Sequence, residues 1–259
     1  MNEDIIYKKE NGIEYIQFKR LLEYGIKHAY TLKGKDIDFS RDSGKMISSY
    51  EKILGALRLD MNYLVIPKQT HTANVKCISS VEKKEDLQEF DGLITNKTEI
   101  VLASQNADCI LFLLYDPVKK VIANIHSGWR GTFKKIVEKA IMKMIVHYQC
   151  EAKDIICCIC PSIRKCHFEV DEDVKKLCEN IFGFMNQTES FIQKGEIKEK
   201  KQKYYIDTIR INKILLKQLG IKEENIIDCE ICSVCNSDKI SSNRVEGKKF
   251  TRATAIISL

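Results

Sequence analysis

Short apolar runs separated by turn residues fill the sequence between residues 62 and 125, and this pattern constrains the fold more than any other feature. Runs of this length and spacing, rich in Ile, Leu and Val, are typical of β-strands. The next segment, 132–148, carries apolar residues at helical spacing and predicts an amphipathic helix with Thr132 near its N-cap. The predicted strands cover residues 64–66, 75–78, 93–95, 100–103, 110–115 and 121–125.

The two ends of the chain continue this mixed pattern. Period-two alternation over 13–18 and an apolar run at 26–32 predict strands, and helical spacing over 47–57 predicts a helix. Beyond the central helix we expect a buried strand at 155–159, helices at 174–182 and 208–219, and a last strand at 253–257, with disorder only over 193–203. The 259 residues are 44% hydrophobic, enough for a substantial core, so we predict one mixed α/β domain over residues 1–259.

Charge and cysteine usage limit the compartment and the partners. The net charge is only +6, and the basic residues are scattered, so we expect no nucleic-acid partner, although a small anion such as phosphate remains compatible. No apolar window approaches the length of a membrane span, and the N-terminus begins with the acidic sequence Met1-Asn2-Glu3-Asp4 rather than a signal peptide. Eleven cysteines, an odd number, then indicate reduced thiols in the cytoplasm.

Three potential metal ligands lie at the ends of predicted strands. His71 follows the run 63–66, Cys109 precedes the run 110–114, and His126 closes the run 121–125. Their spacing is far too wide for a zinc finger, but donors from different strand ends are typical of active sites built on sheets. Two imidazoles and one thiolate suit a zinc ion that keeps a fourth position open for water or substrate. Taken singly, each residue also has an ordinary structural explanation, as a hydrogen-bonded histidine or a core cysteine.

The residues beside these ligands leave two interpretations open. His126 begins the segment His-Ser-Gly-Trp-Arg-Gly-Thr at a strand-to-helix junction, where free N–H groups and Arg130 suit a phosphate; a structural turn with an arginine ion pair fits equally well. Asp108 is a candidate to orient a ligand imidazole or to act as a general base, or it caps local backbone. Because adjacent strand residues point to opposite faces, Asp108 and Cys109 are not expected to serve one centre if both lie in a strand.

The remaining cysteines are expected to be mostly small buried hydrophobic residues. The spacing Cys229-x2-Cys232-x2-Cys235 resembles a metal motif, but it supplies only three thiols and lacks the continuation of a ferredoxin motif. Cys157, Cys158, Cys160 or the pair Cys166-His167 would have to complete such a site. We therefore predict buried structural thiols here rather than a second metal site.

Other common motifs are absent from the sequence. Asp91-Gly92 and Lys33-Gly34 are turn signals. No Walker A, G-x-G-x-x-G or G-x-S-x-G pattern occurs, which disfavours P-loop, dinucleotide-binding and hydrolase-elbow chemistry.

A set of segments in a fixed order makes the chain similar to the YfiH family, also called the laccase-domain or multicopper polyphenol oxidoreductase family. The resemblance is strong from about residue 63 to 174 and weaker to the C-terminus. The segment 104–106 reads Ser-Gln-Asn where an arginine is common in the family, and 241–245 keeps only Arg244, so the substrate rim near Gln105 and Val245 differs. The matching segments are 69–75 (Q-x-H-x-x-x-V), 90–95, 107–109 (Ala-Asp-Cys), 113–117, 126–132, 161–163 and 168–170.

The resemblance implies a three-layer α/β/α sandwich with a mixed sheet, and zinc held by His71, Cys109 and His126, with copper as the alternative metal. It also implies phosphorolysis of adenosine, inosine and methylthioadenosine to free base and ribose 1-phosphate, together with adenosine deamination. The catalytic residues expected on this basis are the three ligands with Arg130 and Asp108. The expected partners are a purine nucleoside and phosphate, on a monomer or a weak homo-oligomer.

Three alternatives remain open on the same sequence. Some bacterial relatives are tied to peptidoglycan editing, which implies an amidase that removes serine from a muropeptide precursor. The older family label implies a copper-dependent polyphenol oxidase, although one zinc in a His2Cys site has no need of redox chemistry. A non-catalytic zinc-binding protein with an altered rim is the third.

Overall fold

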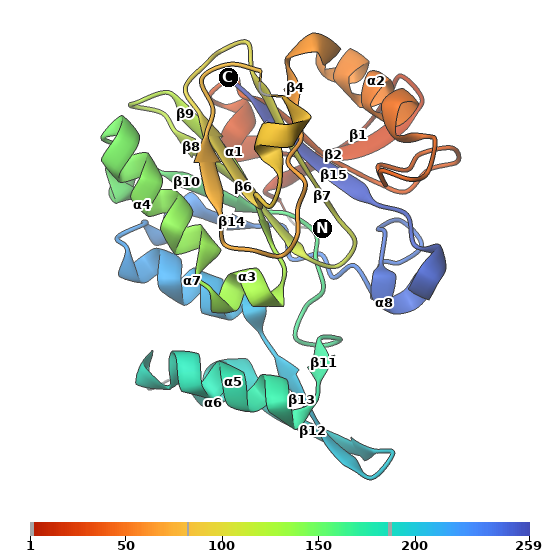
Figure 1. Cartoon of the computed structure of the whole chain (residues 1–259), viewed down its shortest axis with the longest axis vertical. Helices are drawn as coiled ribbons and strands as arrows, with labels where there is room; N and C mark the ends of the chain where they lie inside the picture. Colours follow the sequence, from red (N-terminus) through yellow and green to blue (C-terminus); the bar gives the residue numbers. More distant parts are fainter. Residues whose placement is uncertain (1–2, 82, 186–187) are drawn as a thin grey trace.

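Two six-stranded mixed sheets packed face to face form the centre of the molecule (Figure 1). The computed structural model describes residues 3–81, 83–185 and 188–259. The first sheet has the order β1 (Ile5–Glu10), β2 (Ile13–Phe18), β3 (Lys27–Thr31), β15 (Ala253–Ser258), β7 (Val101–Asn106), β4 (Leu64–Val65). The second has the order β14 (Ile226–Asp228), β10 (Ile156–Ile159), β8 (Ile110–Asp116), β9 (Val121–Ser127), β6 (Gly92–Thr95), β5 (Val75–Cys77).

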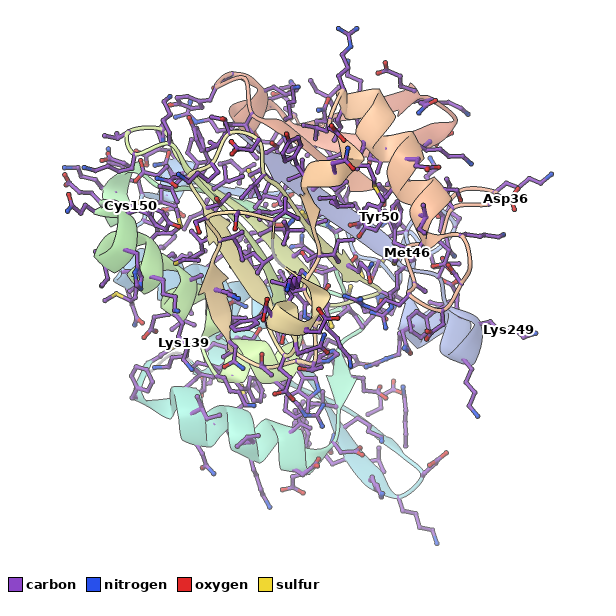
Figure 2. The ribbon with its side chains drawn as sticks, turned by 45° about the horizontal axis from the view of Figure 1, so that its top comes forward. Asp36, Met46, Tyr50, Lys139, Cys150 and Lys249 are labelled. Carbon is purple, nitrogen blue, oxygen red and sulfur yellow. The ribbon has the colours of Figure 1, made fainter. Side chains whose placement is uncertain are left out.

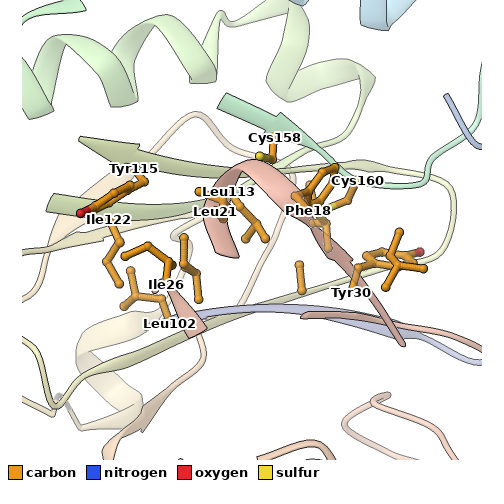
Figure 3. Close-up of a cluster of buried hydrophobic side chains, with 14 of the residues drawn as sticks. Phe18, Leu21, Ile26, Tyr30, Leu102, Leu113, Tyr115, Ile122, Cys158 and Cys160 are labelled. Atoms are coloured by element: carbon orange, nitrogen blue, oxygen red, sulfur yellow. The ribbon is translucent and has the colours of Figure 1, made fainter. Parts of the chain in front are cut away.

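The space between the sheets holds one of the hydrophobic cores. Figure 3 shows Phe18, Leu102, Leu113 and Cys158 pointing into this space from strands of both sheets. Strands buried on both faces carry continuous apolar runs, as β8 does from Ile110 to Tyr115. Each large side chain buried here contributes roughly 1.5–3 kcal/mol, which explains why the central strands are recognisable in the sequence.

A buried asparagine joins the two sheets at their interface. Asn124 lies on β9, and its amide nitrogen donates to the carbonyls of Leu102 on β7 (3.1 Å) and Ala255 on β15 (2.9 Å). Its side-chain oxygen pairs with the hydroxyl of Ser104. Burying an unpaired amide costs free energy. These hydrogen bonds therefore act together with the apolar packing to fix how the two sheets lie against each other.

Helices cover the outer faces of both sheets. The face of the second sheet packs against α4 (Ile136–Tyr148) and α7 (Thr208–Gln218), and that of the first against α2 (Met46–Leu57). Figure 2 shows Asp36 and Lys249 at the periphery, whereas Tyr50 of α2 is fully buried against the first sheet. The predicted mixed α/β sandwich is confirmed, and the structure adds that its β layer is double.

A third, three-stranded sheet lies apart from the two central ones, at the bottom of Figure 1. Its order is β11 (Glu169–Val170), β13 (Lys201–Ile206), β12 (Ile192–Lys198), and α5 (Glu172–Phe182) with α6 (Thr188–Phe191) packs beside it. The prediction of disorder over 193–203 is therefore wrong. The β12–β13 hairpin is largely exposed, so its sequence is polar and carries little of the apolar signal that marks a strand.

The predicted helix 132–148 is also corrected, because the structure divides it. A short α3 (Trp129–Phe133) is followed by α4, with Lys135 between them in the left-handed region at φ 55°. Thr132 lies inside α3 rather than at an N-cap, and its hydroxyl pairs with Ser127 (2.9 Å) and accepts from Asn212 (3.1 Å). The other α-helices in the described part of the chain are α1 (Lys19–Leu22) and α8 (Asn243–Glu246).

No helix among the described residues is long and apolar enough to span a membrane. Met1 and Asn2, which begin the acidic N-terminal sequence noted above, lie outside the described residues.

Candidate active site

The structure brings His71, Cys109 and His126 together from three separate segments. His71 lies between β4 and β5, Cys109 in the connection from β7 to β8, and His126 on β9. Their donor atoms all lie within 4.8 Å of one another, and Cys109 Sγ is 3.7 Å from His71 Nε2. Tetrahedral zinc, with bonds of about 2.3 Å to sulfur and 2.0–2.1 Å to nitrogen, separates such donors by about 3.6 Å. The three residues predicted as ligands thus form one group that could hold a metal ion.

Asp91 orients this group, a role that the sequence did not assign to it. Its Oδ1 lies 2.7 Å from His126 Nδ1, and both side chains are buried. The same carboxylate accepts the backbone N–H of His71 (3.1 Å) and of Thr72 (2.7 Å) and the Thr72 hydroxyl (2.6 Å). One carboxylate therefore fixes the ring of one ligand and the loop of another, as supporting carboxylates do in metal sites.

Burial and neighbouring charges shift the pKa values within this group. Burial disfavours the Cys109 thiolate, but His126 and His71 outweigh it and lower the thiol pKa from 9.0 to about 6. Burial likewise disfavours the His126 imidazolium, but the Cys109 thiolate and Asp91 raise the pKa of His126 to about 9. Hydrogen bonds from His126 and Thr72 overcome burial and hold the pKa of Asp91 at about 2. Without a metal, the group is therefore a thiolate–imidazolium–carboxylate array near neutral pH.

The backbone around the ligands adopts conformations that few residues favour. His71 has φ 61° and Asp108 has φ 83°, both in the left-handed region. Gly128 approaches the ligands so closely that a Cβ there would lie 2.5 Å from His71 Cδ2 and 3.2 Å from Cys109 Sγ. Such strain persists where the surrounding structure enforces it, and it frequently marks functional sites. Here the strained backbone holds the His71 imidazole and the Cys109 thiol in contact with each other and close to Gly128.

A cavity of about 360 Å³ opens beside the three ligands. This volume lies in the range of small-molecule sites. Its wall combines apolar and aromatic side chains with two arginines from the C-terminal part of the chain. Besides the ligands, the residues that line it include Asn106, Asp108, Trp129, Ile163, Phe168, Thr208, Asn243, Arg244, Phe250 and Arg252.

Asp108 lines this cavity, but its carboxylate makes structural hydrogen bonds. Oδ1 accepts from the hydroxyls of Ser233 (2.6 Å) and Ser242 (2.7 Å), and Oδ2 accepts from the backbone N–H of Arg244 (2.7 Å). Asp108 and Cys109 follow β7 in a connection rather than within a strand. Of the three roles considered from the sequence, this geometry is nearest to backbone capping, although the backbone that Asp108 caps belongs to Arg244, far along the chain, and is not local.

Arg130 and the C-terminal arginines occupy different places. Arg130 is exposed at the start of α3, its guanidinium stacks on the Trp129 ring at 4.2 Å, and it does not line the cavity. Arg244 lines the cavity and donates to the carbonyl of His167 (2.9 Å). Arg252 also lines it, and its guanidinium lies over the Phe250 ring, 5.2 Å from the ring centroid.

Sequence reasoning missed Asp91 and Arg252. Asp91-Gly92 was interpreted as a turn, although it lies within the family-like segment 90–95, which is the signal that pointed to it. Nothing in the local sequence marks Arg252, because β15 carries it to the cavity from the far end of the chain.

Comparisons with known proteins agree with this fold. A solved structure described as the hypothetical protein YfiH of Bacillus licheniformis superimposes with a TM-score of 0.87 at 22% identity, over 98% of both chains. The family model described as multi-copper polyphenol oxidoreductase laccase matches residues 37–259, and the chain belongs to this family.

Two bacterial relatives carry the name purine nucleoside phosphorylase. The chain is 32% identical, over 196 residues, to a protein of Bacteroides thetaiotaomicron named purine nucleoside phosphorylase, covering 73% of this chain and 70% of the relative. It is also 32% identical over 200 residues to a purine nucleoside phosphorylase of Clostridium acetobutylicum, covering 76% of each.

Proposed function

We propose that this chain is a zinc-dependent purine nucleoside phosphorylase with adenosine deaminase activity, acting in the cytoplasm. The observation that carries the proposal is the group of His71, Cys109 and His126, held by Asp91 at the edge of a cavity of small-molecule size. Relatives at 32% identity that bear the phosphorylase name supply the substrate class. Eleven free cysteines, most of them buried, fit a reducing compartment.

The donor set fits zinc. Two imidazoles and one thiolate leave one position of a tetrahedron free, and a zinc ion bound there would act as a Lewis acid on an oxygen of water or substrate. Asp91 accepts from Nδ1 of His126, which leaves Nε2 as the metal donor once the imidazolium has lost its second proton. The Cys109 thiol, with its lowered pKa, is ready to bind as a thiolate at neutral pH.

Phosphorolysis requires that phosphate and the nucleoside lie side by side. A phosphate oxygen forms a bond to C1′ while the bond from C1′ to the base breaks, and the base leaves with a proton. Arg252 and Arg244 line the cavity, and a guanidinium fork suits phosphate. Phe250 and Trp129 offer aromatic surface on the same wall for a purine ring. We therefore assign phosphate to the arginines from the C-terminal segment rather than to Arg130.

The proposal is tested by following products. Adenosine, inosine and methylthioadenosine are incubated with the zinc-loaded protein with and without phosphate, and the products are separated by chromatography. We expect free base and ribose 1-phosphate only with phosphate, and some inosine from adenosine without it. Cys109→Ala should lower both rates by at least about 100-fold. Absence of base from all three nucleosides, or unchanged turnover in Cys109→Ala, would refute the proposal.

The oxidase that the family label describes is tested by assaying the same protein loaded with copper and loaded with zinc. A His2Cys donor set also binds copper, so the donors alone do not decide the metal. Oxygen consumption with a phenol in the copper-loaded protein, without phosphorolysis in the zinc-loaded protein, would favour the oxidase.

A further inference from the structure

A second group of metal ligands lies outside the cavity, where buried structural thiols were predicted. Cys166 and His167 belong to the loop between β10 and β11, and Cys232 and Cys235 follow β14. Cys157, Cys158, Cys160 and Cys229 are indeed buried, but Cys166 and Cys235 are exposed. Exposed thiols gain nothing from apolar packing, so the expectation of buried thiols is wrong for these two residues.

The donor atoms of Cys166, His167, Cys232 and Cys235 all lie within 4.8 Å of one another. Cys166 Sγ is 3.6 Å from Cys232 Sγ and 3.9 Å from Cys235 Sγ. His167 Nδ1 is 3.2 Å, 3.7 Å and 3.5 Å from the sulfurs of Cys166, Cys232 and Cys235.

These separations match the edges of a zinc tetrahedron. With Zn–S bonds of about 2.3 Å and a Zn–N bond of 2.0–2.1 Å, the sulfur–sulfur edge is about 3.8 Å and the sulfur–nitrogen edge about 3.6 Å. A disulfide instead requires sulfur atoms about 2.05 Å apart, far closer than any pair here. The four donors therefore surround a common point rather than forming pairs.

Two local turns place the four donor residues before any metal binds. The backbone N–H groups of His167 and Phe168 both donate to the carbonyl of Arg164 at 2.9 Å, which curls the first pair of ligands. In the second turn, the carbonyl of Cys232 accepts from the backbone of Asn236 (3.1 Å) and from its side chain (2.9 Å). The Cys-x2-Cys spacing thus places both sulfurs on one side of a turn, as in zinc sites built from short loops.

Backbone pairing brings the two turns together. β10 and β14 are parallel neighbours, so the loops that follow them leave the sheet at the same edge. Beyond the strands, Ser162 donates its N–H to the carbonyl of Ile231 (3.3 Å), and Ser233 donates to the carbonyl of Ser162 (3.0 Å). Arg164 also forms an ion pair with Asp228. The two loops are therefore held together without a metal, so less conformational entropy is lost when a metal binds.

We propose that Cys166, His167, Cys232 and Cys235 bind a second zinc ion, with a structural role. Three thiolates and one imidazole complete the tetrahedron and leave no position for substrate, which is the pattern of a structural site. The inference is independent of the proposed reaction, because none of the four residues lines the cavity.

A metal bound at this site would stabilise one wall of the cavity. Phe168 follows His167 directly and lines the cavity, and Arg244 donates to the carbonyl of His167 (2.9 Å). On the other loop, the Ser233 hydroxyl donates to the Asp108 carboxylate (2.6 Å), and Asp108 is the sequence neighbour of the ligand Cys109. A metal joining the two loops would therefore hold Phe168 and Arg244 in place without touching substrate.

The test counts zinc in the full-length protein. Wild type, Cys109→Ala and the double variant Cys166→Ser/Cys235→Ser are purified with zinc, dialysed and analysed for metal and thiols. We expect about two zinc ions per chain in wild type and about one in each variant. Cys77→Ser, which changes a partly exposed thiol away from both groups, should keep the wild-type content. Undiminished zinc in the double variant, or an oxidised cysteine pair in the fresh protein, would overturn the proposal.

Cobalt distinguishes the two sites even where a double variant folds poorly. Cobalt added to metal-free Cys109→Ala should give strong thiolate-to-cobalt absorption in the near ultraviolet, since three sulfurs remain at the second site. The single variant Cys235→Ser, at an exposed position, should bind cobalt at this site with weaker absorption and lower affinity. Identical titrations of Cys109→Ala with and without the Cys235→Ser change would contradict the assignment.

Discussion

The carboxylate of Asp91 lies 2.7 Å from Nδ1 of His126, with both groups buried, and the same carboxylate accepts the backbone N–H of His71. Asp108, which is adjacent in sequence to the third ligand, instead bonds Ser233, Ser242 and the backbone of Arg244. The structure thus separates two acidic residues near one site into one that supports the ligands and one that supports the cavity wall.

Asp91→Asn should weaken zinc binding at the triad by about 10- to 100-fold, because the neutral amide removes the charge that favours the His126 ligand geometry. Zinc affinity is measured by competition with a chromophoric chelator in the Cys166→Ser/Cys235→Ser background, where only the triad binds. Asp108→Asn is the matched control, and it should leave triad affinity nearly unchanged while raising the KM for phosphate, because Asp108 holds the backbone of Arg244. Equal losses of affinity in the two variants would contradict the separate roles.

Gly128→Ala should disturb the triad although the position tolerates the backbone angles of alanine. The added Cβ would lie 2.5 Å from the His71 ring, so the ring has to move away from Cys109. Overpacking of this kind costs about 1–3 kcal/mol, equivalent to a loss of about 5- to 150-fold in metal affinity. Gly183→Ala, where nothing lies within 4 Å of the new Cβ, provides the control. If Gly128→Ala binds zinc as wild type does, the close approach is not a constraint.

Arg252→Met should raise the KM for phosphate by about 10- to 100-fold with a smaller effect on the KM for nucleoside, because it removes a charge-assisted contact worth about 1.5–3 kcal/mol. Initial rates measured against phosphate and against inosine separate the two constants. Arg130→Met tests the alternative suggested by the sequence, and it should leave both constants near wild type since Arg130 is exposed outside the cavity. A raised KM for phosphate in Arg130→Met, with an unchanged KM in Arg252→Met, would instead place the phosphate site at the β9–α3 junction.

Zinc binding to the triad should release protons in a pH-dependent way. With a pKa of about 9, His126 is protonated at pH 7.5 and must lose its proton to bind, whereas Cys109, with a pKa of about 6, is already a thiolate. We expect about one proton released per zinc at pH 7.5, more as the pH falls below 6 and Cys109 also carries a proton, and fewer as the pH rises through 9.

Calorimetry in buffers of different ionisation enthalpy measures this release in the Cys166→Ser/Cys235→Ser variant. His126→Ala should abolish most of it at pH 7.5. Zinc binding without proton release at that pH would show that His126 is neutral before the metal arrives.

The sequence alone determined most strands of the central sheets, though not β1 or β14, and singled out the three residues that meet beside the cavity. The strands 110–116 and 121–127 are buried on both faces, so residues 110–115 are all apolar and residues 121–125 are apolar except for Asn124. His71, Cys109 and His126 stand at the ends of such runs. The exposed hairpin β12–β13 escaped prediction because a strand that buries little needs no apolar pattern.

Only the tertiary structure decided which polar residues act together. Asp91 meets His126 because β6 and β9 are antiparallel neighbours, and Arg252 reaches the cavity because β15 pairs with β7. Cys166 and His167 meet Cys232 and Cys235 because β10 and β14 run in parallel. Local sequence fixes which residues form a strand, but strand pairing between distant segments fixes which side chains meet, since that pairing depends on the whole core.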